Sequence, residues 1–237
     1  MPLQVTRSED LRQHLQQLGL QEGDNVVVHS RLLSFGLIEG EAATVLQALQ
    51  QTIGPTGTLI VPTYTFASSA APGTDMGPLS ELVRQQPDAV RSRCPIHSHA
   101  AIGRLRDRLT EPDGSVSLGP GSDFDLMQRH DCKLLLLGCR FSQGATFLHH
   151  LEAVAHVPYR CWVDLPTEPI GCRYYSRRQE QPVRENFDAV IPWMMATGAL
   201  QQADCPYGRS YCMRLRDLAA CVLAQLDINP YALILAT

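Results

Sequence analysis

Residues 133–156 read KLLLLGCRFSQGATFLHHLEAVAH, and this stretch carries the strongest indication of the fold. Residues 134–137 form an apolar run without alternation, which is typical of a central strand buried on both faces. A glycine and a short polar turn follow, and the pattern then predicts a helix that opens near Thr146. A buried strand that leads into a helix favours an α/β fold, in which ligands bind beyond the strand ends.

Three polar side chains share one face of that predicted helix. Thr146, His149 and Glu152 are spaced three residues apart, and positions with this spacing lie one above the other on a helix. A carboxylate that orients an imidazole makes it a general base, and a hydroxyl beside it can donate a hydrogen bond. The segment therefore indicates an acyl-transfer site, although a local His–Glu pair without a catalytic role fits the same spacing.

Metal-binding interpretations compete with this one. His149, Glu152 and His156 lie at i, i+3 and i+7 and could hold zinc, although the usual H-E-x-x-H pattern is missing. A second set of side chains could bind metal or form a Cys–His nucleophile pair in a loop. This second set consists of Cys94, His97 and His99.

The composition limits the possible classes of protein. The chain has 237 residues, of which 44% are hydrophobic, so we expect one well-packed domain over 1–237. The net charge of −4 argues against a nucleic-acid partner. No apolar run approaches the roughly 18 residues of a membrane span, and no export signal opens the chain, so we expect a cytoplasmic protein with reduced cysteines.

Further elements are indicated on both sides of the central stretch. Residues 26–28 and 57–61 read as strands around a helix over 42–53, which predicts a right-handed parallel crossover. Residues 91–103 read as irregular and then helix-compatible, and 211–226 read as a final helix.

Two loops that follow predicted strands carry small polar residues. Residues 29–36 and 62–65 offer hydroxyls and backbone amides that can bind a phosphate or the amides of a pantetheine arm. The chain has no G-x-G-x-x-G, Walker A or G-x-S-x-G motif, which argues against dinucleotide-binding, P-loop and α/β-hydrolase proteins.

An ordered set of segments resembles the aminoglycoside 3-N-acetyltransferase family. The segments are VVVHSRLLSFG at 26–36, GPTGTLIVPTYT at 54–65, MGPLSE at 76–81, RSRCPIHSHAAIG at 91–103, GPGSDF at 119–124 and the stretch at 134–152. Each is unspecific alone, but together and in this order they cover most of the chain. The chain departs from the family pattern at Arg31, at Cys94 before a proline, and at Asp123.

The resemblance implies a fold and an activity. The fold would be a three-layer αβα sandwich, and we expect its central sheet to be mostly parallel. The activity would be direct transfer of acetyl from acetyl-CoA to an amine of an aminoglycoside or a similar polar amine. His149 would be the general base, Glu152 would orient it, and Thr146 would sit near the thioester. No metal is expected.

The resemblance also implies binding residues. The CoA cleft would include Ser30, Arg31, Ser34, Phe35, Gly36, Thr63, His97, Ser98, Gly103, Ser122 and Phe124. The acceptor would meet Tyr64, Asp75 and His150, the last lying at the surface or in the substrate wall.

Several alternatives stay open at this point. The chain could be an acyltransferase of a biosynthetic pathway or of cell-surface amino sugars that uses another acyl donor. It could be a metal-dependent hydrolase, or a member that keeps the fold and binds a ligand without catalysis. A homodimer is a further possibility.

Overall fold

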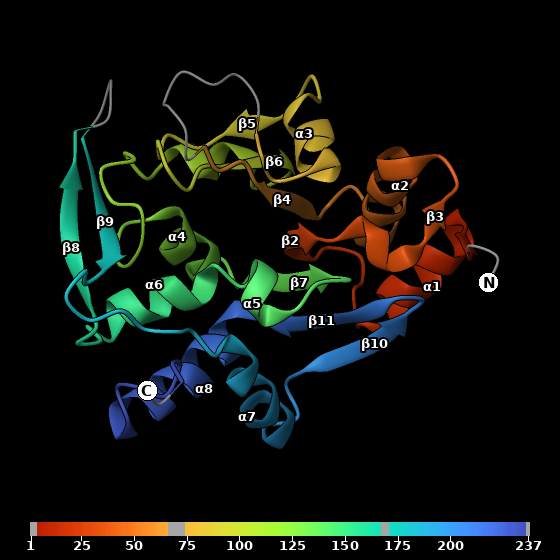
Figure 1. The fold of residues 1–237 in the computed structure, drawn as a ribbon. Helices are drawn as coiled ribbons and strands as arrows, with labels where there is room; N and C mark the ends of the chain where they lie inside the picture. Colours follow the sequence, from red (N-terminus) through yellow and green to blue (C-terminus); the bar gives the residue numbers. More distant parts are fainter. Residues whose placement is uncertain (1–3, 66–73, 167–170, 236–237) are drawn as a thin grey trace.

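The protein is described here by a computed structural model that covers residues 4–65, 74–166 and 171–235. Its centre is a seven-stranded sheet in the order β10-β11-β7-β2-β4-β6-β5 (Figure 1). The strands are β2 (Asn25–Ser30), β4 (Thr58–Pro62), β5 (Val90–Arg91), β6 (His99–Gly103), β7 (Lys133–Leu137), β10 (Gln201–Cys205) and β11 (Gly208–Arg214). Two-stranded sheets form from β1 (Val5–Thr6) with β3 (Leu37–Ile38), and from β8 (Arg160–Leu165) with β9 (Cys172–Arg177).

Only the middle of the central sheet is parallel. Strands β7, β2 and β4 run parallel, as the predicted crossover through α2 (Glu41–Ile53) requires. Beside β7, strands β11 and β10 extend the sheet in antiparallel pairing, and beside β4, strands β6 and β5 do the same. The expectation of a mostly parallel sheet is therefore wrong, because the four outer strands are the ones that the sequence patterns did not reveal.

Two of those outer strands replace predicted helical segments. Residues 99–103 form β6 because they pair along β4, from His99 opposite Pro62 to Gly103 opposite Thr58. Residues 211–214 belong to β11, where they pair with β7, and the last long helix begins only at Leu215. The predicted central strand at 134–137 is confirmed as part of β7, with all five residues buried.

The strands alternate their side chains between two apolar clusters. Adjacent residues of a strand point to opposite faces. Val26 and Val28 accordingly pack with helices α1 (Ser8–Gln17), α2 and α3 (Pro78–Arg84), whereas Val27 packs on the other face. That other face is covered by α4 (Asp123–Arg129), α6 (Phe147–Val154), α7 (Val190–Ala196) and α8 (Leu215–Ile228). A fully buried parallel centre therefore lies between two groups of helices.

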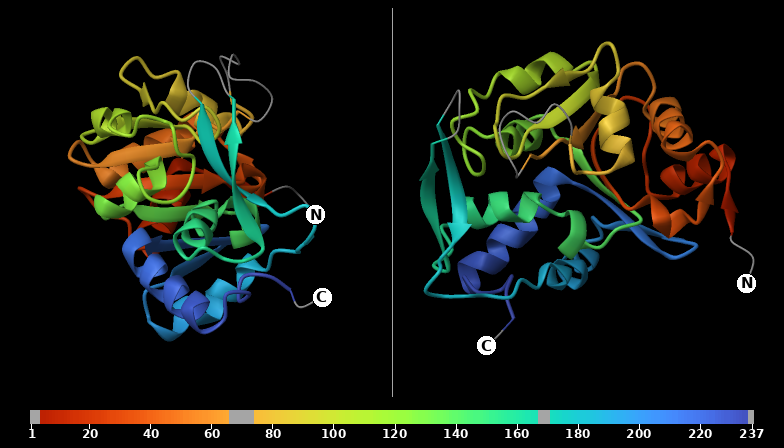
Figure 2. Two further views of the ribbon diagram at one scale, coloured as in Figure 1. Left: turned by 90° about the vertical axis from the view of Figure 1, so that its left-hand side faces the viewer. Right: turned by 45° about the horizontal axis from the view of Figure 1, so that its top comes forward.

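The β8–β9 hairpin stands apart from the central sheet, beside α6 (Figures 1 and 2). It begins six residues after the end of α6, so it brings Arg160 back to the side of that helix. Short helix α5 (Phe141–Gly144) connects β7 to α6 at the carboxyl end of the parallel strands. Among the residues described, no helix is both long enough and apolar enough to cross a membrane.

Candidate active site

The predicted pair of His149 and Glu152 is present on α6. The Nδ1 atom of His149 lies 2.6 Å from Oε2 of Glu152. A carboxylate can only accept, so Nδ1 carries the hydrogen and Nε2 faces away from Glu152. The Glu152 side chain is completely buried, whereas the His149 side chain is 20% exposed. A buried carboxylate thus orients an imidazole whose second nitrogen is open to the outside.

Two residues that follow α6 hold Glu152 in place. The Tyr159 hydroxyl donates to Oε1 of Glu152 over 2.8 Å, and Nε of Arg160 lies 2.8 Å from Oε2. Arg160 is itself buried. A buried carboxylate needs such compensation, because removing a charge from water costs several kcal/mol.

A second carboxylate faces the outer nitrogen of His149. Oε1 of Glu185 lies 3.9 Å from Nε2 of His149 and 2.6 Å from Arg160, while Arg177 contacts Oε2 at 2.7 Å. Burial would raise the pKa of the Glu185 carboxyl, but the facing His149, Arg177 and Arg160 together hold it below its ordinary value. Glu185 is therefore an ionised group at the rim of the site.

Thr146 lies one turn before His149, at the N-cap of α6. Its side chain is half-buried, as is that of His149. Thr146, His149 and Glu152 are therefore spaced along α6 as predicted. The Thr146 hydroxyl and the His149 imidazole reach the surface, and the Glu152 carboxylate lies inside. The amide groups of the first helical turn point towards the same end, where they favour negative charge.

The predicted cofactor residues fall into different environments. Ser30, Arg31 and Gly36 line a largely apolar cavity of about 500 Å³, together with residues of β3 and the start of α2. Ser30 and Arg31 also line an adjoining cavity of about 240 Å³ with His29, Pro62, Met76, Cys139 and Gln143. These two hollows meet at the end of β2, and the second reaches α5, which leads into Thr146.

Other predicted cofactor residues are buried. Ser34 donates to the Gly138 carbonyl over 2.6 Å and accepts from the Arg31 guanidinium over 3.0 Å. Phe35 packs inside the molecule against His14. The remaining buried members of the set are Thr63, His97, Ser98, Ser122 and Phe124. Their contact with a cofactor stays a prediction.

Gly103 is not brought to the same region. It pairs with Thr58 at the beginning of β4, so it lies at the opposite edge of the sheet from Pro62. Strand β6 runs antiparallel to β4 and therefore leads away from the site. The sequence pattern at 91–103 indicated a helix and could not predict this direction. Its φ of 105° and the close approach of the Gly57 backbone explain why this position is a glycine.

The predicted acceptor residues also separate. Asp75 is exposed, whereas the Tyr64 ring is buried among His97, His99 and His29. The expectation that His150 lies at the surface is wrong, and its place in a substrate wall stays a prediction. The rings of Phe124 and Phe147 pack beside its buried imidazole. Nδ1 accepts from the Gly119 amide over 3.1 Å, so the backbone at Gly119 also covers the ring.

The alternative metal sets are not assembled. Helix α6 ends at Val154, and His156 has a φ of 52° in the turn beyond it, so it leaves the face of His149. The Cys94 thiol accepts from the His97 amide, while the two imidazoles nearby bond to Ser117 and Asp123 respectively. In the part of the chain that the structure describes, no group of three or more His, Cys, Asp or Glu could hold a metal ion.

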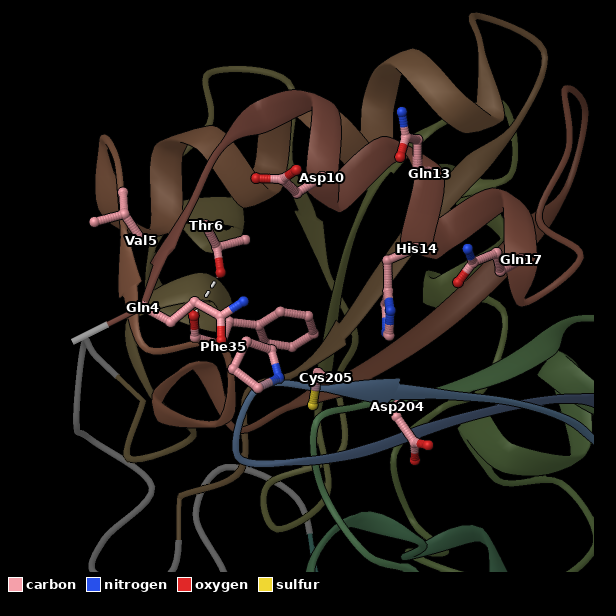
Figure 3. Close-up of a pocket in the computed structure, with 11 residues that line it drawn as sticks. Gln4, Val5, Thr6, Asp10, Gln13, His14, Gln17, Phe35, Asp204 and Cys205 are labelled. Atoms are coloured by element: carbon pink, nitrogen blue, oxygen red, sulfur yellow. Dashed lines mark hydrogen bonds between the residues drawn. The ribbon is translucent and has the colours of Figure 1, made fainter. Parts of the chain in front are cut away.

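A separate polar cavity of about 370 Å³ lies under α1 (Figure 3). Asp10, Gln13 and His14 reach it from α1, and Asp204 reaches it from β10. Phe35 is the one predicted site residue among the lining residues described. The chemistry of His149 therefore lies elsewhere.

Sequence reasoning missed several members of the site. Glu185 and Arg177 come from separate segments, and no spacing along the chain connects them with His149. Arg160 lies beyond the last of the segments quoted for the resemblance, although its buried position against Glu152 makes it central. A buried arginine is visible only once the hairpin has folded back.

Comparisons with known proteins identify the family of this chain. The family model for aminoglycoside 3-N-acetyltransferase matches residues 27–227. Aminoglycoside N(3)-acetyltransferase III of Salmonella sp is 37% identical over 175 residues, which cover 63% of this chain and 61% of that protein. The match thus spans less than two thirds of that relative's length.

Solved structures share the fold. The apoenzyme of aminoglycoside acetyltransferase AAC(3)-IVa superposes with a TM-score of 0.84 at 24% identity, covering 98% of this chain and 93% of that one. AAC-IIIb in a binary complex with CoASH superposes with a TM-score of 0.76 at 21% identity, covering 95% and 97%.

Proposed function

Because this chain belongs to the aminoglycoside 3-N-acetyltransferase family, we propose that it transfers acetyl from acetyl-CoA to an amine of an aminoglycoside or a similar polar amine. The observation that carries the proposal is the half-buried imidazole of His149, backed by the buried carboxylate of Glu152. A protonated amine cannot attack a thioester, so the reaction needs a base that works near neutral pH, as histidine does.

The chemical step follows from the two nitrogens of His149. Nε2 takes a proton from the attacking amine while the amine nitrogen forms a bond to the thioester carbonyl carbon. Glu152 stabilises the imidazolium through Nδ1. The carbon–sulfur bond then breaks, the amide product forms, and the CoA thiolate takes the proton back from the imidazolium. No covalent acyl-enzyme is needed, because the base and the two substrates meet in one place.

The carbonyl oxygen gains negative charge in this step. Thr146 and the amides at the start of α6 stand on the side of His149 where that charge would develop. Glu185 offers an ionised carboxylate beside Nε2 of His149. This carboxylate suits the other N–H groups of the attacking amine, or a neighbouring ammonium group of a polycationic acceptor.

The cofactor would occupy the hollows at the end of β2. Arg31 is exposed where the two cavities meet, and its guanidinium suits the phosphates of CoA. Ser34 fixes that guanidinium from behind through its hydroxyl. The apolar lining from β3 and α2 suits the less polar parts of the cofactor, and the smaller cavity leads the pantetheine arm towards α5. The CoASH complex of the related fold supports this use of the scaffold.

A thiol-release assay tests the proposal. Purified protein is given acetyl-CoA, propionyl-CoA or succinyl-CoA with an aminoglycoside, an amino sugar or a small diamine, and free CoA is followed over time. We expect amine-dependent release that is fastest with acetyl-CoA and an aminoglycoside. Release with another donor or only with amino sugars would favour the biosynthetic or cell-surface alternative.

The same preparation separates the remaining alternatives. Stoichiometric metal by elemental analysis, with activity lost on chelation, would favour the hydrolase. Calorimetry without heat from any acyl-CoA would favour a non-catalytic member and contradict the proposal.

A further inference from the structure

A buried histidine lines the smaller of the two hollows at the end of β2. His29 is 8% exposed, and it lines the cavity of about 240 Å³ at the carboxyl end of the parallel strands. Side chains alternate along a strand, so that of His29 lies on the sheet face of Val27, which α4 and α6 cover. The imidazole is therefore enclosed on the side of the sheet where His149 lies.

The ring nitrogens of His29 have no hydrogen-bond partner among residues 4–65, 74–166 and 171–235. Its backbone carbonyl accepts from the Cys139 thiol over 3.4 Å, and its ring meets that of Tyr64 with 6.3 Å between the centroids. Each of the other buried histidines, in contrast, bonds through a ring nitrogen to a protein group. These pairs are His14 with Ser210, His97 with Ser117, His99 with Asp123 and His150 with the Gly119 amide.

Helix α5 approaches His29 from the side of the reaction centre. A Cβ atom added at Gly144, the last residue of α5, would lie 2.9 Å from Cβ of His29. That approach leaves no room for a side chain at residue 144, and Thr146 follows at the N-cap of α6. Arg31 lines the same cavity as His29. A cofactor arm that enters beside Arg31 and runs towards Thr146 would therefore pass this imidazole.

An unpaired imidazole inside the protein is unfavourable for folding. Burial, with a smaller contribution from His99, lowers the pKa of His29 from 6.5 to about 3, so the ring is neutral at pH 7. A neutral imidazole has one N–H donor and one nitrogen acceptor, and an apolar side chain of similar size would avoid the cost of leaving both unpaired. A bound ligand can supply the missing partners, and a secondary amide offers one donor and one acceptor in return.

We propose that His29 binds the pantetheine arm of CoA, with its imidazole hydrogen-bonded to a secondary amide of that arm. The role rests on the proposed acyl transfer and adds His29 to the cofactor residues that the family resemblance implies. A phosphate group only accepts hydrogen bonds and would select a cation such as Arg31, whereas a neutral imidazole suits an amide. The amide does not change during the chemical step, so His29 contributes to cofactor affinity and not to the rate of transfer.

The test replaces His29 by leucine, which removes both nitrogens at similar volume, and by glutamine, whose amide keeps a donor and an acceptor. Calorimetry measures the Kd of CoA and of adenosine 3′,5′-bisphosphate, which lacks the arm. His29→Leu is expected to raise the Kd of CoA about tenfold, the scale of one lost hydrogen bond, and to change that of the nucleotide less than about twofold. His29→Gln is expected to weaken CoA binding less than His29→Leu does. Equal CoA affinity in the wild type and His29→Leu would overturn the proposal.

A second buried histidine separates binding from a role in folding. His14 is 7% exposed, but its Nε2 atom lies 2.8 Å from the Ser210 hydroxyl. His14→Leu is therefore expected to lower the midpoint of urea unfolding and to leave the Kd of CoA within about twofold. His29→Leu is expected to keep or raise the midpoint, because the folded protein loses no hydrogen bond of a ring nitrogen. A lowered midpoint with unchanged CoA affinity in His29→Leu would mean that the imidazole serves the fold, and would overturn the proposal.

Kinetics complete the test. In the thiol-release assay, His29→Leu is expected to raise KM for acetyl-CoA about tenfold and to change kcat less than about threefold. A lower kcat with unchanged KM would place His29 at the reacting atoms and would overturn the proposal. A wild-type protein that binds CoA but releases no thiol with any amine would instead contradict the proposed function, while calorimetry would still decide the role of His29. The two failures are therefore distinguishable.

Discussion

The His149–Glu152 and His99–Asp123 pairs have the same chemistry but different surroundings. In both, Nδ1 of the imidazole faces a buried carboxylate, at 2.6 Å and 3.0 Å respectively. Nε2 of His149 is directed to the surface, with Glu185 at 3.9 Å. Nε2 of His99 meets the buried hydroxyl of Tyr64. The first imidazole can exchange a proton with a substrate, and the second can only hold its neighbours.

The difference shows that burial of the second nitrogen decides the role of such a pair. A general base must reach the proton that it takes, within hydrogen-bond distance. His149 meets this condition through a half-buried position on α6, and His99 does not, because β6 lies between β4 and β5. The first pair shares α6 with Thr146, whereas the second joins β6 to α4 inside the molecule.

The largest effect is expected where the exposed nitrogen is removed. His149→Ala should lower kcat/KM about 10²- to 10⁴-fold in the thiol-release assay, the usual contribution of a general base. His156→Asn is the control, because that residue is exposed beyond the end of α6 and asparagine tolerates its left-handed backbone. Wild-type rates in His149→Ala would contradict the role of His149 as general base. A loss of activity in His156→Asn would instead favour the metal site of His149, Glu152 and His156.

The carboxylate of the exposed pair should matter for folding as well as for rate. Glu152→Gln leaves the buried Arg160 with one carboxylate partner fewer, and breaking a buried ion pair costs about 3–5 kcal/mol. Urea unfolding measures this loss. Glu111→Gln is the matched control at the exposed pair with Arg108, where a much smaller loss is expected because water screens the two charges. Equal losses of unfolding free energy in Glu152→Gln and Glu111→Gln would mean that the burial of Glu152 does not increase its contribution to stability.

Sequence patterns could predict the first pair and not the second. Glu152 follows His149 by one helical turn, so periodicity alone brings them together. His99 and Asp123 are 24 residues apart and meet only because β6 pairs antiparallel with β4 above α4. Residues 100 and 101 are alanines, which have little tendency to form strands, so pairing in the folded sheet decided that element.

Pairing between distant segments also explains why the outer strands of the central sheet were not predicted. The central strands carry runs of Val, Ile and Leu that are apolar on both faces, and these were recognised. Residues 211–213 lack such a run, and the leucines that follow them extended the helical pattern backwards, although the three residues pair with β7. Local patterns therefore predicted the parallel centre, and long-range pairing determined its antiparallel edges.

Acid should destabilise the protein through three buried histidines, His29, His97 and His150. Burial, with a smaller contribution from neighbouring histidines, lowers the pKa of His97 and of His29 from 6.5 to about 3. Burial likewise lowers the pKa of His150 to about 4. Between these values and 6.5 the unfolded chain binds protons that the folded chain does not, so stability is full above pH 6.5 and falls below it.

The expected loss at pH 5.5 is about 1.4 kcal/mol for each of these three groups. Urea unfolding at pH 7.5 and 5.5 measures the combined loss, to which His14 adds because burial lowers its pKa as well. His150→Gln should reduce the difference by the share of one such group, about 1.4 kcal/mol. A protein equally stable at both values would contradict the burial of these imidazoles in solution.

The smallest effect is expected at Ser122, which positions Asp123 at the start of α4. Its hydroxyl accepts from the Asp125 amide as the N-cap and donates to the Gly119 carbonyl over 2.6 Å. Ser122→Ala should therefore cost about 1 kcal/mol in urea unfolding, the usual value of a lost cap. Ser122→Asn, which can still cap, should recover much of that loss. If Ser122 acts only as this cap, KM for acetyl-CoA should change less than about twofold when the cap is lost. A KM raised tenfold or more in both variants would instead place the Ser122 hydroxyl on the cofactor, as the family resemblance implies.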